Sequence, residues 1–191
     1  MLRLVGPARF VSTLTNCGVH LVLPAGTTAP GLPVILGGAA ISMLDLASLY
    51  GALADGGVVR PVRVEPGSSN GGGPVMGSRA ARQVVAILRG TPPPPGVTSW
   101  ISRSVAFKTG TSYGQRDAWA VGAIPDWTVV AWAGRPDGTA SLGITGRETA
   151  APLMARLLDM LVQNDASLGR RRSIGEPHRR PLTGVAAAGP G

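Results

Sequence analysis

Three apolar segments that follow one another with short connections constrain the fold of this 191-residue chain more than any other feature. They cover residues 104–112, 117–124 and 127–134, and the last two are rich in valine, isoleucine and tryptophan, which favour strands. Pro125 and Asp126 suit a tight turn between the second and third segments. An antiparallel meander is the simplest topology for three strands joined in this way.

Helical patterns precede these strands. Ser42 can cap a helix in which Asp45, three residues later, favours the positive end of the helix dipole. The Asp-Gly-Gly sequence at residues 55–57 then ends that helix. Ser78 is expected to cap a second helix that runs to about Arg89.

Two further helices are expected near the ends of the chain. Residues 7–16 have helical character, and Gly18 is well placed to end that helix. A last helix, beginning near residues 149–152, should pack on one face of the meander. Its apolar stripe has five members: Leu153, Met154, Leu157, Leu158 and Leu161.

The regions between the helices and strands are expected to be loop-rich, because the chain has 28 glycines and 17 prolines. Residues 21–38 and 65–77 are predicted as loops. Residues 58–64, which Pro61 interrupts, fit a short edge strand. Helices around an antiparallel sheet place the chain in the α+β class.

The charge of the chain divides it into two parts. The whole chain has 44% apolar residues, enough to bury a core, and residues 1–165 are predicted to form one folded part. Residues 166–191 contain five arginines against one glutamate among Pro, Gly and Ala, and are predicted to be a disordered tail. Because no aromatic side chains accompany these arginines, nucleic acid is not expected as a partner.

The cysteine and the two histidines give little indication of function. The one cysteine, Cys17, cannot form an internal disulfide, and a catalytic role for it beside His20 lacks an orienting carboxylate. Two histidines without clustered acidic residues predict no metal site, and no cofactor is expected. Neither an export signal nor a transmembrane segment is expected from this sequence.

A single lysine, Lys108, stands beside 17 arginines and opens the run Lys-Thr-Gly-Thr-Ser. Lysine offers a compact charge with rotatable donors, whereas arginine presents a planar fork. Thr109 and Thr111 add hydroxyl donors, and Gly110 lets a substrate backbone approach the strand. The run therefore suits the binding of an anionic substrate.

Simple alternation along a strand would place the side chains of Lys108 and Thr111 on opposite faces. Their joint use in one site therefore predicts a twist or a bulge at Gly110. Without such a distortion, a ligand lying on one face meets only one of the two side chains.

The neighbouring residues indicate a family. The run at 107–114 reads FKTGTSYG and continues as RDAWAVG at 116–122. Further matching runs are GGAAIS at 37–42, ADGG at 54–57, GRPDG at 134–138, TGR at 145–147 and AAP at 150–152. Together, over roughly residues 2–163, they resemble the transpeptidase domain of class A penicillin-binding proteins, most closely the 1C type.

The resemblance implies a β-lactamase or DD-transpeptidase-like fold, here an incomplete domain, with an antiparallel sheet at about 104–134 packed by helices. It implies acyl transfer by a serine at the D-Ala-D-Ala end of a peptidoglycan stem peptide, which β-lactams mimic. Lys108, Thr109, Gly110, Thr111 and Ser112 would bind the substrate. Among them Lys108 would also be catalytic, and the Thr111 backbone N–H would complete the oxyanion hole.

One element of the family pattern is absent from this sequence. The family's serine nucleophile has a lysine three residues later, but Val105 stands three residues before Lys108. Ser68 and Asn70 match the second family motif formally, yet they lie in a Gly-rich loop out of the family order. The chain is therefore expected to be a C-terminal portion that does not acylate alone.

Two other interpretations follow from this departure. The chain could be a non-catalytic module that binds stem peptides, or a fragment that complements a partner. Stem peptide and β-lactams are then expected as partners once the missing half is supplied. The family is extracytoplasmic and membrane-anchored, whereas this sequence made by itself is expected to stay in the cytoplasm.

Overall fold

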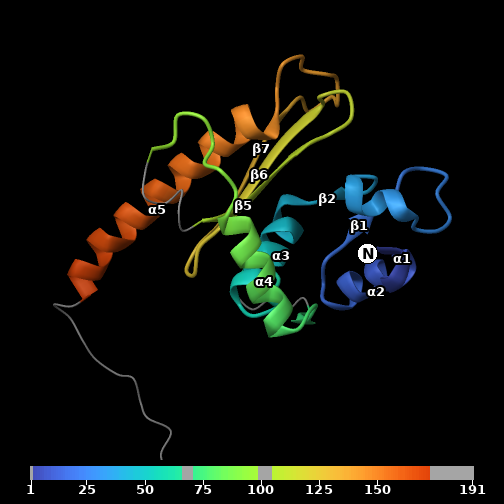
Figure 1. Cartoon of the computed structure of the whole chain (residues 1–191), viewed down its shortest axis with the longest axis horizontal. Coiled ribbons are helices and arrows are strands. Elements are labelled where there is room, and N and C mark those ends of the chain that lie inside the picture. Colours follow the sequence, from blue (N-terminus) through green and yellow to red (C-terminus); the bar gives the residue numbers. More distant parts are fainter. Residues whose placement is uncertain (1, 66–70, 99–104, 173–191) are drawn as a thin grey trace, which may run out of the picture.

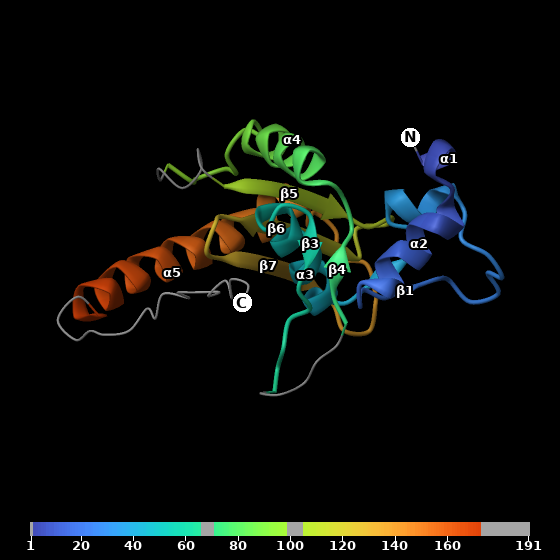
Figure 2. The same cartoon turned by 90° about the horizontal axis from the view of Figure 1, so that it is seen from below.

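The computed structural model of the chain describes residues 2–65, 71–98 and 105–172. Figures 1 and 2 show a central sheet with helices on both faces, and a group of short N-terminal elements beside it. This combination of helices and antiparallel strands confirms the predicted α+β class.

The central sheet is the predicted meander. It consists of β5 (Ala106–Thr111), β6 (Asp117–Ala123) and β7 (Thr128–Gly134), in the order β5-β6-β7 with both pairs antiparallel. Within the described residues, β5 and β7 each pair with β6 alone. Both outer strands therefore leave one backbone edge without a strand partner.

Helix α5 (Ala151–Arg172) covers one face of this sheet (Figure 2). Met154 and Leu158 are buried there against Phe107 and against alanines of β6 and β7. Leu153 and Leu157 each precede one of these two residues and so lie about 100° away from it around the helix, which leaves them 46% and 37% exposed. The predicted stripe was therefore wrong in including these two leucines.

Helices α3 (Met43–Ala54) and α4 (Ser78–Arg89) lie on the other face, α3 over β6 and β7 and α4 beside β5. The predicted cap of α3 is confirmed, since the Asp45 N–H donates to Ser42 Oγ at 3.0 Å. The predicted cap of α4 is wrong. Gly77 has the extended backbone of a cap, and Ser78 is already helical.

The N-terminal elements are α1 (Leu2–Val5) and α2 (Pro7–Asn16), which confirms the helix predicted at 7–16. Gly18 ends it with a φ of 80°, in the left-handed region that glycine favours. Leu14, Cys17 and Val19 form a second core with residues of α3 and β3. Cys17 is buried, and its thiol donates to the Pro74 carbonyl at 3.7 Å, so it serves packing.

Short strands and a 3-10 turn lie in and beside the regions predicted as loops. They are β1 (Leu21–Val22), η1 (Leu32–Leu36), β2 (Ala40–Ile41), β3 (Val58–Val59) and β4 (Gly73–Pro74). β1 pairs with β2, and β3 pairs with β4. The strand expected at 58–64 is thus only two residues long, because pairing stops before Pro61, which has no N–H to donate.

Two expectations on the whole chain meet the structure only partly. Helix α5 continues to Arg172 and so crosses residue 165, where we placed the start of the tail. Residues 173–191 lie outside the described part, so the tail stays a prediction. Among the described residues no helix has the length and apolar character to cross a membrane, and no group of His, Cys, Asp and Glu could hold a metal.

Burial raises the pKa of the Tyr50 phenol on α3. The folded chain therefore favours the neutral phenol, whose stabilising effect is complete below about pH 10 and is lost as the pH rises through the raised pKa. We expect alkaline titration to show a late step in phenolate absorbance that Tyr50→Phe removes. Tyr113→Phe, at a tyrosine 96% exposed, should leave that step in place; its loss in this variant would contradict the assignment.

Candidate functional site

The Lys-Thr-Gly-Thr run lies on β5, whose outer edge has no strand partner in the part of the chain that the structure describes. The Ser112 N–H donates to the Asp117 carbonyl at 2.9 Å, which makes residues 112 and 117 a hydrogen-bonded pair. Because such pairs alternate along an antiparallel ladder, the backbone groups of Thr109 and Thr111 point away from β6. The strand therefore presents outward-facing N–H and C=O groups along its outer edge.

The predicted bulge at Gly110 is wrong. Residues Ala106 to Thr111 pair with β6 in one unbroken register, with Lys108 opposite Val121 and Thr111 opposite Ala118. Lys108 and Thr111 therefore leave opposite faces of the sheet. Both residues nevertheless belong to the same strand, and a ligand that runs along the outer edge of this strand can reach both of them.

Lys108 is exposed and bends toward this edge. Its Nζ donates to the Thr109 carbonyl at 2.6 Å, one of the groups that the ladder leaves outside. An ammonium has three donors, so this bond leaves two for a ligand. Gly110 is exposed beside it, and a Cβ there would meet only Trp119 Cβ, at an ordinary 3.7 Å.

Two of the three hydroxyls of the predicted site, those of Thr111 and Ser112, have partners within the chain. Thr111 Oγ1 accepts a hydrogen bond from the Gly146 N–H at 3.0 Å. Ser112 Oγ accepts from the Asp117 N–H at 2.8 Å and so closes the turn between β5 and β6. Both oxygens thus accept from a backbone N–H, and each hydroxyl keeps its proton for another acceptor.

Two loops meet beyond Thr111 at the same end of the sheet. The Gln115 carbonyl accepts from the Ser141 N–H at 3.0 Å, and Gln115 Oε1 accepts from the Gly143 N–H at 2.9 Å. Tyr113 and Leu142 stand on these loops and are 96% and 91% exposed. The open edge is therefore continued by exposed apolar side chains.

Polar and charged residues near the lysine run have partners within the chain. Asp117 Oδ1 accepts from Trp132 Nε1 at 2.9 Å, and the rings of Trp119 and Trp132 lie 6.3 Å apart on the Lys108 side of the sheet. Arg147 donates from Nη1 to the Pro92 carbonyl at 3.2 Å and from Nη2 to the Pro93 carbonyl at 2.9 Å. Arg147 is thus engaged with the backbone.

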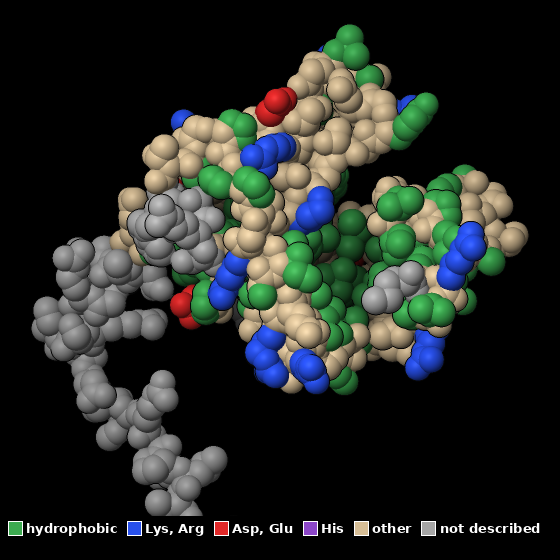
Figure 3. All heavy atoms as spheres, viewed as in Figure 1, with side chains coloured by type: hydrophobic (Ala, Val, Ile, Leu, Met, Phe, Trp, Pro, Cys, Tyr) green, Lys and Arg blue, Asp and Glu red, His purple; other side chains and the backbone are tan. Residues whose placement is uncertain are grey.

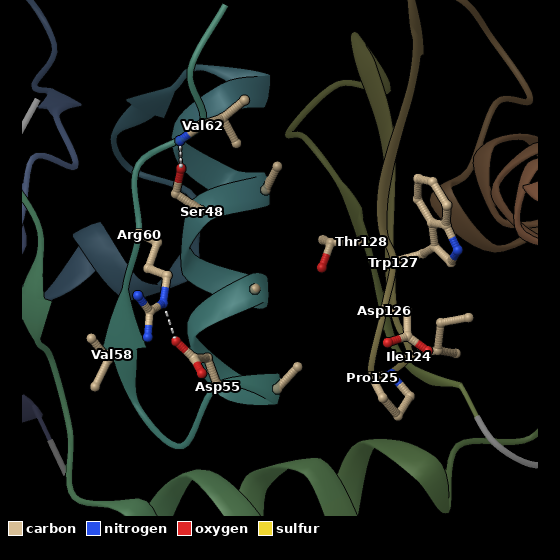
Figure 4. Close-up of a pocket in the computed structure, with 13 residues that line it drawn as sticks. Ser48, Asp55, Val58, Arg60, Val62, Ile124, Pro125, Asp126, Trp127 and Thr128 are labelled. Carbon is tan, nitrogen blue, oxygen red and sulfur yellow. Dashed lines mark hydrogen bonds and ion pairs between the residues drawn. The ribbon is translucent and has the colours of Figure 1, made fainter. Parts of the chain in front are cut away.

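A cavity of about 360 Å³ lies elsewhere, between α3, the segment after β3 and the turn from β6 to β7. Figure 4 shows its polar side chains, with Arg60 paired to Asp55 and Ser48 accepting from the Val62 N–H at 3.0 Å. None of residues 107–112 lines it. The cavity and the lysine strand are therefore separate places.

The space-filling view adds the shape of the surface around these elements. Figure 3 shows apolar side chains gathered in a hollow between the N-terminal elements and the rest of the molecule, with Lys or Arg side chains near it. Leu4, Leu36 and Val22 are among the large apolar residues that remain exposed. The described residues thus leave apolar surface uncovered.

The structure brings together four of the five predicted site residues, 108–111, along one edge and gives Ser112 to the adjoining turn. Their roles toward a substrate stay predictions. Sequence reasoning missed the contact of Gly146 with Thr111, which joins residues 35 positions apart. Its one signal was the Thr-Gly-Arg run at 145–147. Ser68 and Asn70 lie outside the described residues.

Comparison with known proteins gives one clear match. No protein-family model matches the chain. Over 170 residues the chain is 38% identical to penicillin-binding protein 1C of Escherichia coli (strain K12). This alignment covers 88% of the chain and 22% of that protein, so the chain spans about a fifth of the length of its relative. Over most of its length, therefore, the chain matches a portion of a penicillin-binding protein.

Proposed function

We propose that the chain forms the substrate-carboxylate wall of a peptidoglycan DD-transpeptidase with a β-lactamase-like fold. The observation that carries the proposal is the open edge of β5, where the exposed Lys108 ammonium lies beside outward-facing backbone groups of Thr109 and Thr111. A peptide that ends in a carboxylate can lie along this edge as an added strand. The match to a penicillin-binding protein supports the same conclusion.

In the proposed reaction, a serine Oγ attacks the carbonyl carbon of the penultimate D-alanine. The C–N bond to the terminal D-alanine breaks, and its nitrogen leaves as an amine after taking up a proton. Lys108 holds the terminal carboxylate, and the Thr111 N–H, which points out of the ladder, donates to the developing oxyanion. An amine of a second stem peptide then displaces the serine and forms the cross-link.

The serine of this reaction lies outside these 191 residues, since Val105 stands three residues before the one lysine. We therefore expect no stoichiometric covalent label when the purified chain is incubated with a fluorescent penicillin. A chimera in which the chain replaces the matching portion of the Escherichia coli protein should be labelled. Gel fluorescence with boiled and penicillin-competed samples measures both.

The unchanged Escherichia coli protein is the positive control for this experiment. Stoichiometric labelling of the 191-residue chain would contradict the assignment of the nucleophile. A chimera that is folded by circular dichroism, yet stays unlabelled, would contradict the proposed function.

A second candidate is a non-catalytic module that binds stem peptides. The observation favouring it is that the carboxylate-binding edge is present while the serine is not. In this case the chain binds a D-Ala-D-Ala peptide reversibly, and the chimera gains no penicillin label. The two candidates thus differ in the chimera and agree in their use of Lys108.

A further inference from the structure

We infer that Gly146 and Arg147 are positioning residues that hold the carboxylate-binding strand in place and orient the Thr111 hydroxyl. Both lie at the start of η3 (Gly146–Ala150), a π-helical turn that leads into α5. The inference rests on the proposed function, because it assigns these two residues to the same binding edge. Neither residue touches the substrate in this account.

Gly146 fixes the direction of the Thr111 hydroxyl. Its N–H donates to Thr111 Oγ1 at 3.0 Å and so occupies an acceptor site of that oxygen. The donor belongs to the backbone and cannot rotate away as a side chain would. The hydroxyl proton of Thr111 is therefore left to donate to a ligand, which suits a carboxylate because a carboxylate only accepts.

No other residue fits at position 146. A Cβ there would lie 2.5 Å from the Trp119 carbonyl oxygen and 2.9 Å from the Gly110 nitrogen, and it would also strike the Gly110 carbonyl oxygen. These are backbone atoms of the β5–β6 pair, and they cannot yield without disturbing the pairing of the two strands. Glycine therefore allows η3 to lie directly on the strand that carries the lysine motif.

Arg147 ties the same turn to a second segment. Its guanidinium donates to the Pro92 and Pro93 carbonyls, 3.2 and 2.9 Å away, in the connector that follows α4. Proline fixes φ, so these carbonyls form a stiff target for a planar fork. These two bonds direct the Arg147 guanidinium to the connector and hold it beside the turn.

The turn is itself anchored at its beginning. Thr145 caps it, since Thr145 Oγ1 accepts from the Glu148 N–H at 3.1 Å. Its end continues into α5, whose Ala151 and Met154 belong to the main core. The η3 turn is thus fixed to the core through α5, and its residues Gly146 and Arg147 contact β5 and the proline connector.

The test compares two probes on the purified 191-residue chain by NMR titration. One is an N-acylated L-Lys-D-Ala-D-Ala peptide with a free carboxylate, and the other is its C-terminal amide. We expect the wild-type chain to prefer the carboxylate form. Gly146→Ala should reduce that preference by at least about threefold, the effect of one net hydrogen bond, and should also weaken binding of the amide, because its Cβ disturbs the pairing of β5 with β6.

Thr111→Val, which removes only the hydroxyl, should lower the preference about three- to tenfold while binding of the amide changes little. Arg147→Met should also reduce the preference, with Arg147→Lys restoring part of it. The matched control is Gly77→Ala, since a Cβ at Gly77 meets nothing within 4 Å and its φ is −70°.

The outcomes separate this inference from the proposed function. If the wild-type chain shows no preference for the carboxylate peptide, the proposed function fails. If the wild-type chain shows it and folded Gly146→Ala and Arg147→Met keep it in full, the positioning role fails and the function stands. Should Gly146→Ala lose the native circular dichroism spectrum, Arg147→Met decides, and an unchanged preference in that variant overturns the inference.

Discussion

Replacing Lys108 by alanine is expected to lower the affinity of the chain for a D-Ala-D-Ala peptide about 10- to 100-fold. The terminal carboxylate then loses a charge-assisted hydrogen bond, an interaction worth about 1.5–3 kcal/mol. No other lysine in the sequence can take its place. The dissociation constant, measured by NMR titration or calorimetry at fixed ionic strength, gives the effect directly.

Arg116→Ala is the matched control for this prediction. It removes one positive charge from the loop that follows β5, at an exposed residue outside the lysine motif. If a general positive field attracted the peptide, both variants would weaken binding alike. Added salt would then remove the difference between the variants and the wild-type chain. Unchanged affinity in Lys108→Ala would remove the basis for the proposed binding edge.

Leu158→Ala is expected to destabilise the chain by about 2–5 kcal/mol. Leu158 is fully buried between α5 and the sheet, in contact with the cluster that contains Phe107 and Met154. Truncation leaves a cavity there that the alanine-lined strands cannot fill. Chemical denaturation followed by the near-ultraviolet circular dichroism of the tryptophans measures the free energy of unfolding.

The neighbouring Leu157 supplies the comparison. It is 37% exposed on the same helix, so Leu157→Ala should cost far less than Leu158→Ala. The pair of variants tests which side of α5 faces the sheet. Equal losses would indicate that the helix packs through the stripe predicted from sequence, which includes both leucines.

The central sheet was predictable because its information is local. Short connections and β-branched residues fixed three adjacent strands, and the capping pair Ser42 and Asp45 fixed the start of α3. The facing of α5 was not predictable in the same way. Five large apolar residues define the stripe in the sequence, whereas the residues of α5 in the main core are Ala151, Met154 and Leu158.

The site shows the same division. The chemical character of residues 108–111 can be read from their types, and their position on a strand follows from the meander. How these residues lie relative to one another depends on the register with β6 and on which backbone groups point away from it. Neither can be predicted from residues 108–111 alone. The support from Gly146 and Arg147 comes from contacts across 35 or more residues, for which a single sequence has no pattern.

The outer edge of β7 has a consequence for the behaviour of the chain in solution. Natural sheets protect such edges with charged residues, prolines or bulges, but β7 reads Thr-Val-Val-Ala-Trp-Ala-Gly and pairs with β6 in unbroken register. Nothing in this strand opposes pairing with the same strand of another copy. Self-association through intermolecular β-pairing therefore competes with folding as concentration rises. A binding partner that covers this edge would protect the chain from such self-association.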